Sequence, residues 1–151
     1  MHHRILFLCT GNYYRSRFAE ILFNTLAVQS NLNWSAFSRA LAIEKGACNI
    51  GPISPHTRAA CEARGIAIPE PTPFPCGVAT EDFAAATRVI ALKEAEHRKY
   101  MNDRFPQWLD RVEFWHVHDL DAADPEDACA QIERHVSDLV RQLRNEKSAV
   151  R

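Results

Sequence analysis

The sequence predicts an α/β fold: a single-domain, four-stranded parallel sheet with helices on both faces. Strand-like and helix-like segments alternate along the chain, and this favours a parallel sheet because each connection lays a helix on one of its faces. The first strand-like segment is a continuous apolar run, as expected of a strand covered on both faces. The chain has 151 residues, 46% of them hydrophobic, which suits one core, so we expect one domain over residues 1–151.

The predicted elements begin with a strand over residues 3–8, whose apolar residues are consecutive. A helix over 17–26 follows, because its apolar residues recur at helical spacing. Residues 34–41 form the second expected strand. The second helix begins at Ser54-Pro55, since serine can cap a helix and proline is tolerated in its first turn, and it ends at Gly65.

The second half of the chain continues the alternation. Prolines at every second position from 69 to 75 exclude a helix or a central strand there, so this segment is predicted to be a surface loop. A short helix starts at Thr80, and the third strand covers 88–92 and precedes a polar helix. The fourth strand covers 112–117, and the apolar stripe of residues 126–144 predicts the longest helix.

Charge and cysteine usage exclude several classes of protein. A formal net charge of -1 and a pI near 6.6 give no general attraction to nucleic acid or to a membrane surface. The N-terminal apolar run is too short for a signal peptide, and no other apolar stretch has the length of a membrane span. Five cysteines without a C-x-x-C pair fit neither a secreted disulfide framework nor a zinc site. We therefore expect a cytoplasmic protein with reduced thiols.

The segment from Cys9 to Ser16, with the letters CTGNYYRS, joins the first strand to the first helix. In an open parallel sheet, ligands bind beyond the carboxyl ends of the strands, where this segment begins. Gly11 permits close approach of the backbone to an anion, and Asn12 can adopt a positive φ, so successive amides can point inward. The following helix presents its positive end, which favours phosphate. The expected phosphate-binding residues are Thr10, Gly11, Asn12, Tyr13, Tyr14, Arg15 and Ser16.

Three side chains of this segment predict a reaction. A thiol near a helix N-terminus and a cation ionises readily, and the thiolate is the nucleophilic form, so Cys9 is the expected nucleophile. Arg15 can bind two oxygens of one phosphoryl group, which lysine cannot do with the same geometry. Ser16 is placed to donate a hydrogen bond to the sulfur. A buried structural cysteine and a solvated arginine are the competing interpretation.

The same residues carry a resemblance to a known family. Ile5 through Asn12, then Arg15-Ser16 and Ala19-Glu20, resemble the low-molecular-weight protein tyrosine phosphatases, and the likeness continues in order to the final helix. The resemblance implies a phosphotyrosine phosphatase I-like fold and a two-step hydrolysis without metal or other cofactor. In it Cys9 attacks phosphorus and forms a phosphocysteine, while Arg15 and the loop amides stabilise the equatorial oxygens. The implied substrate is a phosphotyrosine protein or a small aryl phosphate, and we expect phosphate-like oxyanions to inhibit.

The family also implies an aspartic acid, on a loop after the fourth strand, that protonates the leaving oxygen and then helps to activate water. We prefer Asp119, because it directly follows the fourth predicted strand. Family members usually have Asp-Pro at this place, and the only Asp-Pro here is Asp124-Pro125. Asp124 fits better as a helix N-cap, since proline and glutamate follow it. Asp121, or no acid at all, completes the alternatives.

One position of the loop departs from the family. Its members often carry a second cysteine five positions after the nucleophile, where this chain has Tyr14, so the protective disulfide that such a cysteine forms should be absent. Tyr13 and Tyr14 can offer an aromatic surface to a substrate ring. The competing interpretation is that Tyr14 packs under the loop.

Three alternative functions stay open. A thiol-dependent arsenate reductase shares the scaffold and the loop but needs further cysteines, and Cys76 has no near partner in the sequence. A weakly catalytic phosphate-binding module would keep the loop and turn over slowly. His116 and His118 suggest metal-dependent hydrolysis, but no matching cluster of ligands occurs elsewhere in the sequence, so we expect no metal.

Overall fold

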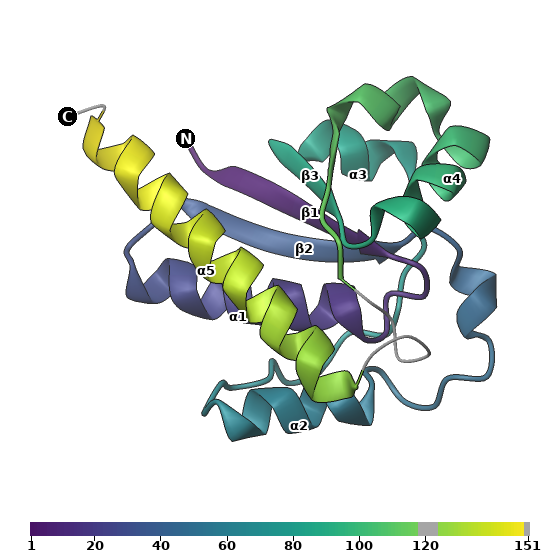
Figure 1. The fold of residues 1–151 in the computed structure, drawn as a ribbon, viewed down its shortest axis with the longest axis horizontal. Coiled ribbons are helices and arrows are strands. Elements are labelled where there is room, and N and C mark those ends of the chain that lie inside the picture. Colours follow the sequence, from purple (N-terminus) through teal and green to yellow (C-terminus); the bar gives the residue numbers. More distant parts are fainter. Residues whose placement is uncertain (118–123, 150–151) are drawn as a thin grey trace.

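Four parallel strands form the sheet, in the order β2-β1-β3-β4 (Figure 1). The computed structural model describes residues 1–117 and 124–149. Strand β1, one of the two inner strands, pairs along its whole length with β2, from His3 opposite Trp34 to Cys9 opposite Ala40. The strands are β1 (His3–Cys9), β2 (Trp34–Ala40), β3 (Arg88–Ala91) and β4 (Val112–Phe114).

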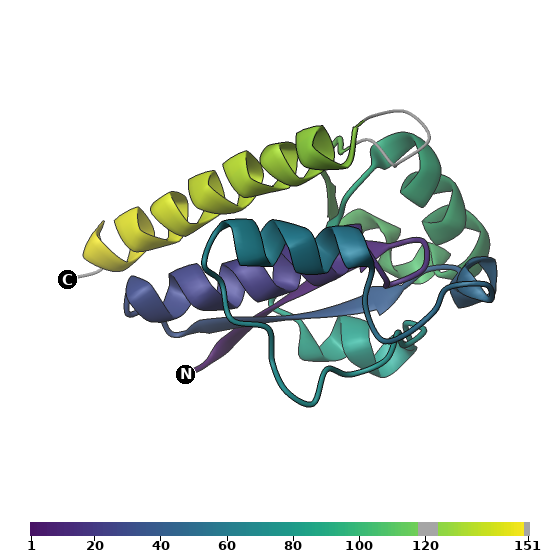
Figure 2. The same cartoon turned by 90° about the horizontal axis from the view of Figure 1, so that it is seen from below.

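Helices cover both faces of this sheet (Figures 1 and 2). They are α1 (Arg15–Gln29), α2 (Pro55–Ala63), α3 (Thr80–Ala85), α4 (Glu94–Arg104) and α5 (Pro125–Ala149), with the short 3-10 helices η1 (Ile43–Gly46) and η2 (Pro106–Arg111). Buried residues of α1, α2 and α5 pack in one cluster with one face of the sheet, and those of α3 and α4 pack in a second cluster with the other face. The predicted fold class is confirmed.

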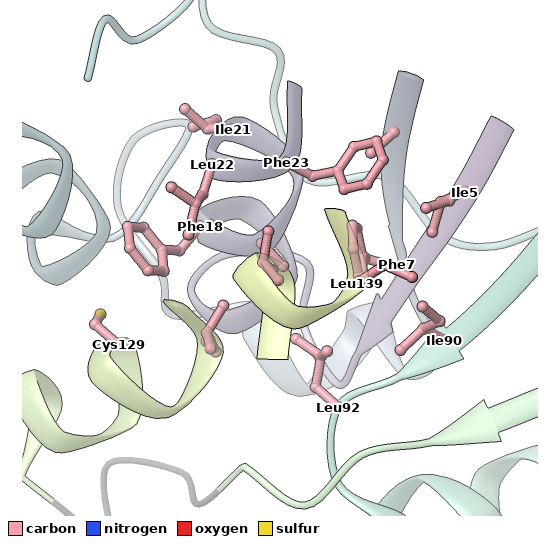
Figure 3. Packing of buried hydrophobic residues seen from close by; sticks show 14 of the residues in the cluster. Ile5, Phe7, Phe18, Ile21, Leu22, Phe23, Ile90, Leu92, Cys129 and Leu139 are labelled. Atoms are coloured by element: carbon pink, nitrogen blue, oxygen red, sulfur yellow. The ribbon is translucent and has the colours of Figure 1, made fainter. Parts of the chain in front are cut away.

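The alternation of side chains along β1 explains the two layers. Ile5 and Phe7 point to the α1 and α5 side, and Leu6 and Leu8 point to the α3 and α4 side, and all four are fully buried. Figure 3 shows Phe7 among residues of α1, β3 and α5, including Leu139. Burial of each such side chain contributes about 1.5–3 kcal/mol of transfer free energy. The continuous apolar run that the sequence shows is therefore the centre of the fold.

The longest helix, α5, packs its apolar stripe against α1. The predicted stripe residues are all buried, namely Ile132, Val136, Leu139, Val140 and Leu143. Within the described residues, no helix has both the length and the apolar character that a membrane span requires. The proline-rich segment lies between α2 and α3 and forms neither helix nor strand, as predicted.

Several predicted boundaries differ from the observed ones, and two of these differences lie near the carboxyl edge of the sheet. The first helix begins at Arg15, inside the CTGNYYRS segment, and not at residue 17. The fourth strand ends at Phe114, which pairs with Ala91 at the end of β3, and not at residue 117; backbone hydrogen bonds continue beyond this pair. The Val117 amide donates one of these to the Leu92 carbonyl, at 2.7 Å.

Candidate active site

The Cys9–Ser16 loop begins at the carboxyl end of β1, and its backbone is held by the chain that follows β2. The Leu41 amide donates to the Cys9 carbonyl and the Ala42 amide to the Thr10 carbonyl, both at 2.9 Å. The Ser54 amide, just before α2, donates to the Tyr13 carbonyl at 3.0 Å. The loop is therefore fixed on both sides before α1 starts.

The Cys9 thiol lies inside this loop and is 3% exposed. Its Sγ atom is 3.0 Å from the hydroxyl oxygen of Ser16, in the first turn of α1. Arg17, which is also 3% exposed, interacts electrostatically with Cys9. Burial lowers the pKa of Arg17, and the charges of Glu20 and Cys9 act against that shift. The sulfur thus lies at a helix N-terminus, beside a hydroxyl and close to guanidinium charge.

Asn12 organises the floor of the loop. It has a φ of 53°, in the left-handed region that asparagine tolerates, and its side chain is almost fully buried. Its amide group donates to the hydroxyls of Ser16 and Ser38, both at 2.9 Å, and its oxygen accepts from the Cys76 amide at 3.0 Å. All three contacts reach different parts of the chain, so the strained backbone angle is held from several sides.

The direction of these hydrogen bonds follows from Glu20 of α1. A carboxylate only accepts, so the Ser38 hydroxyl, which contacts Glu20 Oε1, donates to it and accepts from Asn12. Burial raises the pKa of Glu20, and the Ser38 hydrogen bond acts against that shift. Asn12 also donates to the Ser16 oxygen, which accepts from the Cys9 thiol as well. Donation from Ser16 to a Cys9 thiolate stays a prediction.

The Arg15 guanidinium is 3% exposed and lies in the same first helical turn. Its Nη2 atom is 3.6 Å from Oε1 of Glu96, at the start of α4, and its Nη1 atom donates to the Val117 carbonyl at 3.5 Å. These contacts fix the side chain from two other strand ends of the sheet. Arg15 is buried and paired with Glu96, so its interpretation as a solvated arginine is wrong. Cys9 is buried at the end of β1, and its role as the nucleophile stays a prediction.

Glu96 is linked to the loop by a second polar chain. The Lys93 amide donates to Nδ1 of the buried His97 at 3.0 Å, so in the neutral ring Nε2 carries the proton. Nε2 lies 3.2 Å from the Thr10 hydroxyl, which in turn donates to Glu96 Oε1. Glu96 thus meets both Thr10 and Arg15, and it keeps its ordinary acceptor role in both contacts.

The two tyrosines of the loop have different environments. The Tyr13 hydroxyl donates to the Ile50 carbonyl at 2.6 Å and ties the loop to the segment before α2. Tyr14 is 6% exposed and belongs to the core cluster of α1 and α5. The interpretation that Tyr14 packs under the loop is confirmed, and its ring does not offer a surface to a substrate.

The candidates for the general acid lie partly outside and partly inside the described residues. Asp119, the preferred acid, and Asp121 lie outside the described residues, as does His118. The carboxylate of Asp124 accepts from the Glu126 amide at 2.9 Å, which caps the N-terminus of α5 and confirms the N-cap interpretation of Asp124. In the part of the chain that is described, no group of three or more histidine, cysteine or carboxylate side chains is arranged to hold a metal ion.

All five cysteines are free, and apart from Cys9 they form two pairs by exposure. Cys48 and Cys76 are exposed, whereas Cys61 and Cys129 are buried. Burial, followed by the charge of Cys129, raises the pKa of Cys61 to about 11. Burial likewise raises the pKa of Cys129, against a hydrogen bond from Tyr14. Thiols of this kind are poor relays for oxidation, so they give no support to an arsenate reductase.

The raised pKa values predict the order of thiol modification. At pH 8 a thiol with a pKa of about 11 is ionised in roughly one molecule in a thousand, so Cys61 should resist iodoacetamide while Cys48 and Cys76 react. Peptide mass spectrometry of the native protein after timed alkylation measures this. Denaturant should abolish the difference. Alkylation of Cys61 in the native protein as fast as that of Cys48 would contradict the assignment of Cys61 as a buried structural thiol.

Sequence reasoning did not identify Glu96, His97 or Ser38 as parts of the site. Each lies on or just after a strand, or in the first turn of the helix that follows one, at the edge of the sheet where the loop lies. Their position near this edge is the signal that could have identified them, because ligand sites of parallel sheets form beyond the carboxyl ends of the strands. The motif itself contains no information about which side chains on other strands complete it.

Comparison with known proteins agrees with this geometry. The family model for low molecular weight phosphotyrosine protein phosphatases matches residues 4–149. No significant match is found among curated proteins. YfkJ from Bacillus subtilis has a TM-score of 0.81 at 22% identity, with 97% of this chain and 98% of that chain covered.

Two further solved structures share the architecture. Vibrio vulnificus Wzb, in complex with benzylphosphonate, has a TM-score of 0.77 at 14% identity and covers 94% of this chain and 99% of its own. The YwlE arginine phosphatase from Geobacillus stearothermophilus has a TM-score of 0.74 at 23% identity, with 97% and 96% covered. At these identities the likenesses establish the fold.

Proposed function

Because the chain belongs to the low molecular weight phosphotyrosine protein phosphatase family, we propose that its Cys9–Ser16 loop hydrolyses phosphomonoesters with Cys9, Arg15 and Asp119 as the catalytic residues. The family is one of cysteine-dependent phosphatases that act on phosphorylated substrates. The observation that carries the assignment of Cys9 is its sulfur at 3.0 Å from the Ser16 hydroxyl, at the N-terminus of α1, with Arg15 in the same turn. This arrangement supports a nucleophile and a cation acting on one bound anion.

In the first proposed step the Cys9 thiolate attacks phosphorus and the bond from phosphorus to the leaving oxygen breaks. Asp119 gives its proton to that oxygen, so the product leaves as an alcohol or a phenol. Arg15 and the amides of Thr10 through Ser16 bind the three equatorial oxygens, whose charge grows in the transition state. The chain of hydrogen bonds from Asn12 through Ser16 supports the thiolate before attack.

In the second proposed step water attacks the phosphocysteine. The phosphorus–sulfur bond breaks, phosphate leaves, and the Cys9 thiolate returns with its electron pair. Asp119, now a carboxylate, accepts a proton from the attacking water. The loop and Arg15 bind the same oxygens in both steps, so no rearrangement of the site is required between them.

The substrate class we propose is a phosphotyrosine protein or a small aryl phosphate. The family supports phosphotyrosine. The complex of Vibrio vulnificus Wzb with benzylphosphonate supports it further, because that ligand carries a phenyl group and a phosphonate. We also propose inhibition by phosphate-like oxyanions, since they occupy the same amides. The five free thiols suit a reducing compartment, so we place the protein in the cytoplasm.

Initial rates on two substrates, with an inhibitor and a chelator, test the proposal. The wild-type protein should hydrolyse a phosphotyrosine peptide faster than phosphoarginine, the substrate class that the name of the YwlE arginine phosphatase indicates for that protein. Orthovanadate should block turnover, and EDTA should leave it unchanged. Loss of activity with EDTA would favour metal-dependent hydrolysis. Tight phosphate binding without turnover would favour the phosphate-binding module. Faster hydrolysis of phosphoarginine would contradict the proposed phosphotyrosine substrate.

Replacement of the proposed acid should have an effect that depends on the leaving group. In Asp119→Asn we expect kcat/KM for phenyl phosphate to fall by about 10²-fold or more, because a poor leaving group needs the proton. For 2,4-dinitrophenyl phosphate the fall should be less than about threefold, since that phenolate leaves unprotonated.

Asp124→Asn is the matched control for this prediction. Asparagine caps a helix as well as aspartate does, so the start of α5 keeps its hydrogen bond from Glu126 while the titratable proton is removed. We expect kcat/KM of this variant to stay within about twofold of the wild type on both substrates. A leaving-group-dependent loss in Asp124→Asn, with none in Asp119→Asn, would transfer the role of acid to Asp124.

A further inference from the structure

The side chain of Tyr14 connects the Cys9–Ser16 loop to the beginning of α5. Its hydroxyl donates to the carbonyl of Pro125, the first residue of that helix, at 3.0 Å, and lies 3.8 Å from Sγ of Cys129. The phenol is 6% exposed, so this hydrogen bond forms away from competing water. A residue inside the candidate active-site loop thus contacts a helix that starts more than a hundred positions later in the chain.

The next residue of the loop makes an equivalent contact. Nη1 of Arg15 donates to the carbonyl of Val117 at 3.5 Å, and the Val117 amide donates to Leu92 at 2.7 Å. Val117 and Pro125 lie on either side of Asp119 in the sequence. Two consecutive loop residues therefore contact the backbone on both sides of the proposed acid.

Both partners of the Tyr14 hydrogen bond are held in place. On the loop side, the Thr57 hydroxyl of α2 donates to the Tyr14 carbonyl at 3.1 Å. On the helix side, Asp124 caps α5, and the guanidinium of Arg64 binds Glu126 at 2.9 Å and Glu133 at 3.1 Å. The hydroxyl of Tyr14 consequently links two fixed backbones and not two adaptable surfaces.

We propose that Tyr14 is a positioning residue for leaving-group protonation: through Pro125 it sets where the chain that carries the acid enters α5, relative to the phosphate bound in the loop. The inference rests on the proposed function. Proton transfer to the leaving oxygen needs a hydrogen-bond distance of about 2.6–3.2 Å, so a displacement of the acid by a fraction of that distance slows the step. In the proposed function, phosphate binding depends on the loop amides and Arg15, whereas the Tyr14 hydroxyl donates to the backbone of α5.

Tyr14→Phe tests the inference, because phenylalanine keeps the ring and the backbone amide and removes only the hydroxyl. We expect kcat/KM for phenyl phosphate to fall by about tenfold, and kcat/KM for 2,4-dinitrophenyl phosphate to fall by less than about twofold. The ratio kcat/KM is the correct readout, because it reports the steps up to formation of the phosphocysteine. The inhibition constant of inorganic phosphate should stay within about twofold of the wild type.

Thr57→Val is the matched control. It also removes one buried hydroxyl that contacts Tyr14, but it leaves the contact with Pro125 intact. Thermal unfolding should show a similar loss of stability in both variants. Only Tyr14→Phe should discriminate between the two leaving groups.

A double-mutant cycle places the effect on the acid. If Tyr14 acts through Asp119, the double variant Tyr14→Phe, Asp119→Asn should be no more than about twofold slower on phenyl phosphate than Asp119→Asn alone. An equal loss on both leaving groups, a full tenfold loss added to Asp119→Asn, or no loss at all would overturn the inference. Failure of the proposed function is a separate result, because a wild-type protein without turnover on either ester would overturn both.

Discussion

Cys9→Ser should lower kcat/KM by at least about 10⁴-fold on every phosphomonoester and leave phosphate binding in place. A serine hydroxyl is far less acidic than a thiol, so it does not supply the anionic nucleophile that the proposed step needs. The side chains are similar in size, and the amides proposed to bind the phosphoryl oxygens belong to the backbone. Phosphate release from a phosphotyrosine peptide gives the rate, and retention of the peptide by immobilised Cys9→Ser gives the binding.

Cys48→Ser is the matched control for this result. Cys48 is exposed, so the same change of sulfur to oxygen there should leave kcat/KM unchanged. If Cys9→Ser retained more than about a hundredth of the wild-type kcat/KM, a nucleophile other than this sulfur would carry the reaction. The trapping form has a second use, because a phosphorylated protein that co-purifies with it from the source cell identifies the substrate.

Arg15→Lys should lower kcat/KM by about 10³-fold although the charge is kept. Lysine can still pair with Glu96, so the fold around the site should survive, but an ammonium group does not bind two equatorial oxygens in one plane. Because the charge on those oxygens grows in the transition state, the loss should appear mainly in kcat. Steady-state kinetics with phenyl phosphate, together with the inhibition constant of vanadate, measures it.

Arg141→Lys serves as the control for Arg15→Lys. Arg141 is largely exposed on α5 and pairs with Asp138 at 3.0 Å, so the same chemical change there should alter neither kcat nor KM. If Arg15→Lys retained more than about a tenth of the wild-type kcat/KM, a single positive charge would be enough for the reaction. Binding of two equatorial oxygens by the planar guanidinium would then not be required.

The parts of the site that are predictable from the sequence are those that are close in the sequence. An apolar run, a glycine, an asparagine and an arginine-serine pair within one short segment determine the strand, the turn and the helix start, because each property is local. The positive φ of Asn12 and the contact between Cys9 and Ser16 both lie within that segment, although Ser38 and Cys76 also hold Asn12. The layers on the two faces of the sheet follow from the alternation of strands and helices.

The remaining parts depend on contacts between distant segments. Nothing in the local pattern around Glu96 distinguishes it from other acidic residues of α4, and its role is visible only when the carboxyl ends of β1 and β3 lie side by side. The same holds for the contact of Tyr14 with Pro125, which requires the placement of α5. The predicted end of β4 was wrong for a related reason, because this strand ends where its pairing with β3 ends.

The hydrogen bonds that anchor the Cys9–Ser16 loop have a consequence for affinity. Amides from the segment after β2, from the N-cap of α2 and from the proline-rich segment all donate to the loop, so the protein's own contacts order it. The loop is therefore already ordered before an anion binds, and binding does not have to offset the loss of its conformational entropy. A simple tetrahedral oxyanion such as phosphate should consequently bind without any organic group attached. In the proposed function, the ordered loop would bind the phosphoryl group that all substrates share. Differences in affinity between substrates would then come from their organic parts.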